Sequence, residues 1–303
     1  MSGRISAWLA GAPLDQQRSD SAFSRGNRTM PVRHRPGVVC ALVSGLLAVG
    51  LVTGPAFAAD DIEGPDDTDP ASTEMATSSF INGARVDDAG EADGTSTEWA
   101  KQIKLAVIEA SLPDDDDATT TDASGATAAV SYNTIGITTQ MQQKHYWCGP
   151  AAGRAALTAF SVTKAQSTLA TKMHTDSDGT YASKIPAALN AYQSRNGYKD
   201  SKNTSSAKDL FARVKINVDG GWKAPLIPLV QGHSLPIWSS NGYHGLHFIT
   251  LYGYGSDGVS LKYFDPVDAN ALYGRHAVNR KYVWAAMNAN YGGDGKADNE
   301  LVW

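Results

Sequence analysis

The sequence predicts an α+β domain in which helices come first along the chain and antiparallel strands follow. Apolar side chains recur with helical spacing in several segments between about residues 151 and 214. The pattern then changes to short runs of aliphatic and aromatic residues between about 226 and 264. Because the helical and strand-like segments do not alternate, a parallel sheet built from βαβ units is not expected.

Each element has its own local signal. The helix after Cys148 runs through alanine and glycine to Phe160, and Asn196-Gly197 is expected to end a later helix. Ser205 or Ser206 is the expected N-cap of the last helix in this block. The expected helices span 151–160, 167–173, 181–196 and 206–214, and the expected strands span 226–230, 235–238, 248–254 and 259–264.

Charge divides the chain of 303 residues into two regions of opposite sign. Residues 60–122 contain 18 Asp and Glu against three basic residues, a net charge of −15, whereas residues 130–303 contain 17 Lys and Arg against 11 acidic residues, a net charge of +6. The acidic region is also rich in Ser, Thr, Gly and Pro, which favours disorder. We therefore expect an acidic, mostly disordered arm or propeptide at 59–129 and a folded domain at 130–303. The positive charge of the domain is too diffuse to indicate nucleic-acid binding.

One segment of the arm is predicted to be helical. Between residues 97 and 112, the apolar residues Trp99, Ile103, Ala106, Val107 and Ala110 fall on one helical face, and Pro113 ends the pattern. This is the pattern of a propeptide or of a segment that docks on the basic domain. A solvated spacer with a marginal helix is the alternative, and the sequence leaves both open.

Residues 1–58 are predicted to be removed as a secretory signal peptide. A basic start at 33–35 precedes an apolar run at 38–53, and Ala56-Phe57-Ala58 offers cleavage after Ala58. Since signals begin at an initiator methionine, Met30 is a more natural start than Met1. The apolar run is short for a membrane span, so we expect a secreted protein without stable membrane insertion. Cys40 would leave with the signal.

Cys148 is then the only cysteine of the mature chain, in the stretch Tyr146-Trp147-Cys148-Gly149-Pro150-Ala151-Ala152. Proline suits the first turn of a helix, so Cys148 is expected just before or at a helix N-terminus. Unpaired N–H groups and the positive end of the helix dipole stabilise a thiolate there. The small residues that follow let neighbours approach closely, which predicts a buried helix with a nucleophile at its exposed tip. A small core cysteine is the alternative.

A histidine and an aspartate are predicted to meet about a hundred residues downstream. If 248–254 and 259–264 form a hairpin with Tyr254 opposite Val259, His247 falls opposite Pro266 and within one residue of Asp265. A carboxylate that accepts the imidazole N–H fixes the tautomer and favours the charged ring, which in turn stabilises a thiolate. Cysteine with a His–Asp pair is the minimum set for a thiol acyl-transfer enzyme.

Other residues compete for roles in such a site. Gln142, six residues before Cys148, could donate to an oxyanion together with the Cys148 N–H, with Gln140 and Gln143 as rivals. His244 is a rival of His247. Trp147 and Trp238 either line a groove or pack in the core. The remaining histidines lack metal-ligand spacing, so no metal and no cofactor are expected.

Together these residues resemble a known family. Gln142, the block Trp147–Ala152, His247 ahead of the apolar strand, and Asp265-Pro266 are similar to the papain-fold cysteine peptidases related to bacteriocin-processing peptidase domains. The resemblance is nearest to the secreted, stand-alone, peptidase-like branch and covers about residues 135–290. It implies a papain-like fold, with an N-terminal helical part that carries the nucleophile helix and a C-terminal antiparallel sheet.

The resemblance also implies roles for individual residues. Cys148 would be the nucleophile, His247 the general base and acid, Asp265 the residue that orients the imidazole, and Gln142 the oxyanion donor. The leading hypothesis is a secreted cysteine peptidase that cleaves a peptide or protein substrate through an acyl-enzyme on Cys148. The alternatives are a transglutaminase-type amide or acyl transferase and a catalytically silent module that binds peptide or cell-wall material.

Overall fold

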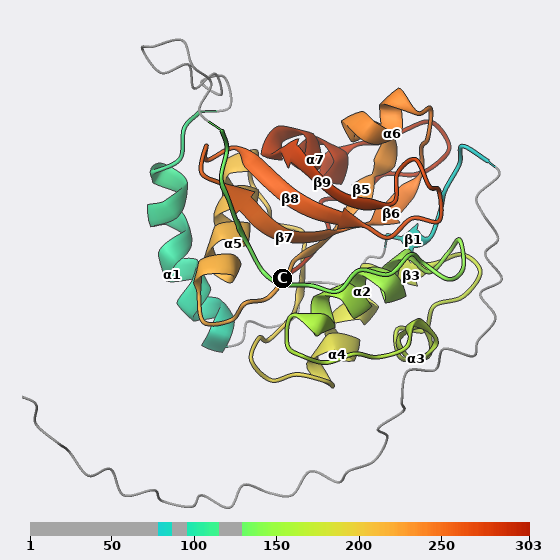
Figure 1. The fold of residues 1–303 in the computed structure, drawn as a ribbon, viewed down its shortest axis with the longest axis horizontal. Helices are drawn as coiled ribbons and strands as arrows, with labels where there is room; N and C mark the ends of the chain where they lie inside the picture. Colours follow the sequence, from blue (N-terminus) through green and yellow to red (C-terminus); the bar gives the residue numbers. More distant parts are fainter. Residues whose placement is uncertain (1–77, 87–95, 115–128) are drawn as a thin grey trace, which may run out of the picture. The chain divides into compact units, whose positions relative to one another are not determined.

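The computed structural model describes residues 78–86, 96–114 and 129–303 (Figure 1). The expected signal peptide at 1–58 and much of the acidic arm lie outside the described residues. Among the helices that are described, none combines the length and the apolar character needed to cross a bilayer.

The described residues form an α+β structure, as the sequence predicts. The helices are α1 (Ser96–Ala110), α2 (Cys148–Thr158), α3 (Gln166–Lys172), α4 (Ile185–Asn190), α5 (Ala207–Asp219), α6 (Pro236–Ser240) and α7 (Arg280–Asn288). The strands are β1 (Ala84–Arg85), β2 (Tyr132–Thr134), β3 (Thr180–Tyr181), β4 (Asp200–Ser201), β5 (Ile227–Gln231), β6 (Leu246–Phe248), β7 (Thr250–Gly255), β8 (Ser260–Asp265), β9 (Gly274–Asn279) and β10 (Leu301–Val302).

Two four-stranded sheets carry most of the strands. One has the order β4-β10-β5-β6 and the other the order β2-β7-β8-β9, while β1 and β3 form a separate parallel pair. In Figure 1, α2, α3 and α4 gather on one side of the strands, and α5 lies beside β7 of the second sheet. The core has a corresponding division: one apolar cluster joins the second sheet to α5 and α7, and another joins α2, α3 and α4 to β5 and β6.

The predicted strand at 248–254 is divided between the two sheets. Residues 246–248 pair with β5, and the chain then passes through Ile249 into β7, which pairs with β8 and β2. Leu251 also exchanges two backbone hydrogen bonds with Leu226, at 2.8 and 2.9 Å. Every residue of both strands is buried, so no exposed position marks the division, and the sequence pattern did not show it.

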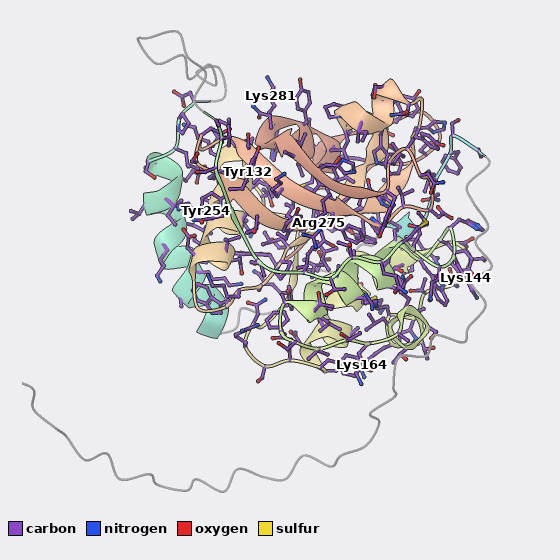
Figure 2. The ribbon with its side chains drawn as sticks, viewed as in Figure 1. Tyr132, Lys144, Lys164, Tyr254, Arg275 and Lys281 are labelled. Atoms are coloured by element: carbon purple, nitrogen blue, oxygen red, sulfur yellow. The ribbon has the colours of Figure 1, made fainter. Side chains whose placement is uncertain are left out.

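The hairpin register also differs from the prediction. Tyr254 pairs with Leu261 instead of Val259, because the turn is longer than expected and Asp257 accepts from the N–H groups of Val259 and Ser260 at 3.1 and 2.9 Å. A bulge between Leu251 and Gly253 then shifts the register by one residue. At the far end, Arg275 of β9 donates to Ile137 O at 2.6 Å and so ties the sheet to the incoming chain (Figure 2).

Two helix predictions and one strand prediction need correction. The helix expected at 181–196 is limited to a 3-10 turn and α4, since the Asn190 side chain bonds to both backbone groups of Tyr198 at 2.8 Å and stabilises a loop there. The helix capped by Ser206 is longer than expected and reaches Asp219. The strand expected at 235–238 is wrong: Pro236 begins the short helix α6.

Candidate active site

Cys148 is the first residue of α2, which confirms its predicted place at a helix N-terminus. Trp147 precedes it and makes no side-chain cap hydrogen bond to the N–H groups of the first turn. Glycine allows close packing around the helix: a Cβ on Gly149 would lie 2.6 Å from Thr180 Oγ1, and one on Gly153 would lie 2.6 Å from Met173 Cε. Lys144, labelled in Figure 2, lies ahead of the helix with Nζ 4.7 Å from the centre of the Trp147 ring.

His247 and Asp265 form a buried pair, although they come from different sheets. His247 lies within β6 opposite Val230, and Asp265 is the last residue of β8. Their Nε2 and Oδ1 atoms are 2.8 Å apart, and both side chains are fully buried. The expected meeting of this histidine and this aspartate is therefore confirmed. It depends on the transfer of the chain from one sheet to the other at Ile249.

Two further donors hold the Asp265 carboxylate. Trp238 Nε1 donates to Oδ2 at 2.8 Å, and the backbone N–H of Val267 donates to Oδ1 at 3.1 Å. The Trp238 ring also lies against the imidazole, with the ring centres 4.9 Å apart. A side chain on Gly232 would collide with this indole, since its Cβ would lie 2.1 Å from Trp238 Cε3. Sequence reasoning left Trp238 as either a groove or a core residue and did not find this contact.

The environment of His247 favours the charged ring. Complete burial acts to lower its pKa, but the charges of Asp265 and Cys148 and their hydrogen-bonding groups outweigh burial and raise the pKa to about 10. Nε2 faces Asp265, which leaves Nδ1 as the nitrogen available to the thiol. Nδ1 has no partner at full hydrogen-bond geometry among the described residues, so Cys148 acts on the ring mainly through its charge.

Gln142 is buried beside the end of β8. Its backbone N–H donates to Pro266 O at 2.6 Å, and its side-chain Nε2 donates to His145 O at 2.7 Å and to Asp268 Oδ1 at 3.2 Å. Both amide protons are thus in use in this structure.

The loop around Gln142 is held by a residue that the sequence did not single out, Gln166. This fully buried glutamine donates to Gln140 Oε1 at 3.0 Å and to Met141 O at 2.8 Å, and its Oε1 accepts from the Gln143 N–H at 3.0 Å. A polar residue at the start of a short helix gives no periodic signal, so Gln166 could be found only from the coordinates.

The other histidines belong to different contacts. His244 Nδ1 lies 2.6 Å from Asp294 Oδ2 and its ring contacts Phe80 and Tyr291, so the rival of His247 pairs with another carboxylate. His233 stacks on Tyr291 with ring centres 4.1 Å apart. In the described part of the chain, no group of three or more His, Cys, Asp or Glu side chains is placed to hold a metal ion.

The expected exposure of Cys148 is not observed. Cys148 and His247 both have 0% exposed surface. A segment N-terminal to the predicted domain, residues 79–86, lies against the start of α2 at Gly83, and we call it the cleft strand. A Cβ on Gly83 would lie 2.8 Å from Cys148 Sγ and 3.1 Å from Tyr146 Cα.

A helical half that presents a cysteine at a helix start, joined to an antiparallel sheet that carries a His–Asp pair, defines the class of papain-like cysteine peptidase folds. The model of the Peptidase C39-like family matches residues 132–296, more than half of the chain. The chain therefore belongs to the Peptidase C39-like family. Membership of this family supports activity as a cysteine peptidase.

Two further comparisons complete these findings. Among solved structures, a protein from Bacillus anthracis that is assigned to the C39-like peptidases is 14% identical to this chain, with a TM-score of 0.39. The match covers 57% of this chain and 96% of the other. No curated protein sequence matches the chain.

Proposed function

We propose that this protein is a cysteine peptidase that cleaves peptide bonds through an acyl-enzyme on Cys148. The observation that carries the proposal is the fully buried His247–Asp265 pair, whose 2.8 Å contact leaves the second imidazole nitrogen for the thiol at the start of α2. Family membership supports the same activity.

The proposed reaction follows from the charge state of the pair. Because the pKa of His247 is raised to about 10, the ring holds a proton at neutral pH and the thiol proton is its source. The Cys148 thiolate attacks the substrate carbonyl carbon, and a tetrahedral oxyanion forms. His247 then gives its proton to the leaving amine, and the C–N bond breaks. Water, deprotonated by His247, attacks the thioester and releases the acid, with Cys148 again a thiolate.

Asp265, Trp238 and Gln142 have supporting roles in this proposal. Asp265 holds the imidazole in one orientation, and Trp238 holds Asp265 through the second carboxylate oxygen. The N–H groups of the first turn of α2 are the fixed donors for an oxyanion. For Gln142 to assist them, its amide must exchange the 3.2 Å contact with Asp268 for the substrate oxygen.

Peptide hydrolysis tests the proposal directly. Casein is incubated with the wild-type protein and with Gly83→Val, a substitution designed to displace the cleft strand. Each of the two proteins is also tested with Cys148→Ala added. New peptides are identified by mass spectrometry. We expect cleavage that requires Cys148 and is fastest for Gly83→Val. An added primary amine distinguishes hydrolysis from acyl transfer, because a transferase would incorporate the amine into the products. Cleavage that persists after Cys148→Ala, or that is absent from both chains with Cys148, would show the proposal to be wrong.

We also propose that the protein acts outside the cell. The support is the basic start, apolar run and Ala-x-Ala site that end at Ala58. Expression of the full sequence in a secreting host should release a protein whose N-terminus is Ala59. A cell-associated protein that retains residues 31–58 would contradict this.

A further inference from the structure

The cleft strand lies between two parts of the domain and bonds to both through its backbone. On one side, the N–H groups of Ile81 and Gly83 donate to His244 O at 2.9 Å and Leu246 O at 3.3 Å, and Ser79 O accepts from the His244 N–H at 2.8 Å. On the other side, Gly83 O accepts from the Thr180 N–H at 3.0 Å, and Ala84–Arg85 pairs in parallel with β3. The contacts are those of an extended peptide added to a strand edge.

Two glycines shape this groove for a peptide backbone. Gly179 has φ +104°, and a Cβ on it would lie 2.3 Å from Gly83 O. Gly245 has φ +127°, and a Cβ on it would lie 1.8 Å from Ile81 O. Both residues occupy backbone conformations that favour glycine, and both face the cleft strand. No other residue type would leave room for a chain at this depth.

The side chains of the cleft strand are also accommodated. Ile81 and Ala84 are 2% and 1% exposed and belong to different apolar clusters of the domain, one around the sheets and one around α2. Arg85 forms an ion pair with Asp176 at 2.9 Å and lies 4.1 Å from the centre of the Tyr181 ring. Between these anchors, Gly83 passes over Cys148 Sγ.

We propose that this groove is the peptide-binding site of the enzyme and that residues 79–86 of the same chain occupy it as a built-in inhibitor. The cleft strand lies outside residues 132–296, which match the family model. With the strand in place, Cys148 and His247 have no exposed surface, so a substrate carbonyl cannot reach the thiol. The enzyme is therefore latent until the strand leaves. The choice of a peptide substrate rests on the proposed function, whereas the covering of Cys148 is tested without turnover.

Gly83→Val tests the covering. The new side chain cannot fit between Cys148 Sγ and the Tyr146 backbone, so the strand must leave the groove. Gly136→Val is the matched control, because a Cβ on Gly136 has no atom within 4 Å. The readout is the rate of alkylation of Cys148 by iodoacetamide at neutral pH, followed by intact mass. We expect Gly83→Val to react at least about tenfold faster than wild type and Gly136→Val to react at the wild-type rate. Equal rates for all three proteins would overturn the proposal.

A second variant and a synthetic peptide test the same proposal independently of Gly83→Val. Arg85→Ala removes the ion pair and the ring contact without touching Cys148, and we expect alkylation to be about two- to fivefold faster. A synthetic peptide of residues 78–86 should slow alkylation of Gly83→Val, and the same peptide with Gly83→Val should not. Specific occupancy of the groove would be refuted if neither peptide slowed alkylation of the thiol. It would also be refuted if both peptides slowed it equally.

Two outcomes separate this inference from the proposed function. If Gly83→Val is alkylated rapidly but cleaves no casein peptide, the covering of Cys148 by the cleft strand stands and the peptidase activity is wrong. If wild-type protein cleaves casein and its Cys148 reacts as fast as that of Gly83→Val, the peptidase activity stands and the inhibitor assignment is wrong. A chain cut within residues 79–86 in wild type but not in Cys148→Ala would also overturn the assignment, since the strand would then be a substrate.

Discussion

At the scale of single residues, the position of His247 depends on how Asp265 is held. Its carboxylate accepts from the imidazole, from the Val267 N–H and from the Trp238 indole, all within 3.1 Å and without solvent contact. A buried carboxylate that loses a donor keeps the cost of its desolvation. We therefore expect Trp238 to act on the proposed reaction through Asp265, as a positioning residue.

Trp238→Phe should destabilise the protein and slow peptide hydrolysis. The substitution keeps an aromatic ring near His247 but removes the N–H that Asp265 Oδ2 accepts. We expect the free energy of unfolding in urea to fall by about 2 kcal/mol. In the Gly83→Val background, where the thiol is uncovered, we expect kcat to fall by about tenfold with little change in KM. Trp284→Phe is the matched control, because Trp284 Nε1 has no hydrogen-bond partner among the described residues. Equal effects of the two substitutions would contradict the role of Trp238.

The raised pKa of His247 predicts how stability changes with pH. Since the pKa in the folded state, about 10, lies above the ordinary value of 6.5, the charged ring stabilises the fold fully below about pH 6.5, and this contribution is lost as the pH rises through about 10. We expect the free energy of unfolding to decrease by a few kcal/mol between pH 6.5 and 10.5.

Asp265→Asn provides the test of that pH dependence. Asp265 is the largest of the influences that raise the pKa of His247, so the substitution should lower the pKa and flatten the decline in stability above pH 6.5. Urea unfolding at four pH values measures the slope. His145→Gln, at an exposed histidine, should keep the wild-type slope. A wild-type slope in Asp265→Asn would show that another group titrates.

At the scale of elements, α2 is the one that sequence predicts best. Proline in the first turn fixes its start, and the alanine and glycine run fixes its burial, because both signals are local. The strand that carries His247 is different. Its division at Ile249 depends on pairing with β5 on one side and with β8 on the other, and no local pattern marks where one pairing ends and the other begins, so register and sheet membership could not be predicted. The same holds for Trp238, whose partner is 27 residues away.

The packing of α2 against α3 should be sensitive to size at Gly153. A Cβ there lies 2.6 Å from the flexible end of Met173 and 3.5 Å from Leu189 Cδ2, which is an ordinary contact, so Gly153→Ala should be tolerated. Gly153→Leu adds volume that the contact cannot absorb, and we expect a loss of about 1–3 kcal/mol in the free energy of unfolding. Met173→Ala in the same chain should recover part of that loss, as a double-mutant cycle in urea would show. Strictly additive losses would contradict direct packing between the two residues.

At the scale of the whole molecule, the sequence predicts the individual segments better than it predicts how those segments pack against one another. Composition divides the chain at about residue 130, and the expected helix in the acidic arm is observed as α1. Neither pattern indicates that residues 79–86 lie over Cys148, because an extended segment of eight residues has no periodicity that names its partner. The covering of the thiol is thus a property of tertiary structure alone.

The second contact of this N-terminal region is α1, which packs on α5. Lys101 is 2% exposed; its Nζ donates to Asn196 Oδ1 at 2.8 Å and lies 5.0 and 5.4 Å from the ring centres of Trp303 and Trp222. Leu105 is buried in the sheet core, and Glu109 Oε1 accepts from Ser206 Oγ at 3.0 Å. With α1 held, the cleft strand is joined to a fixed point by residues 87–95, which limits how far the strand can move from the groove.

Lys101→Ala should therefore expose Cys148 although it lies on another element. The substitution leaves Asn196 without its cation and removes two cation–ring contacts, so α1 is held less tightly and the local concentration of the cleft strand at the groove decreases. We expect alkylation of Cys148 to be about two- to tenfold faster. Lys104→Ala is the control, because Lys104 is exposed and lies 5.6 Å from the Trp222 ring centre. If Lys101→Ala lowered the melting temperature but left the alkylation rate unchanged, α1 and the cleft strand would be independent attachments.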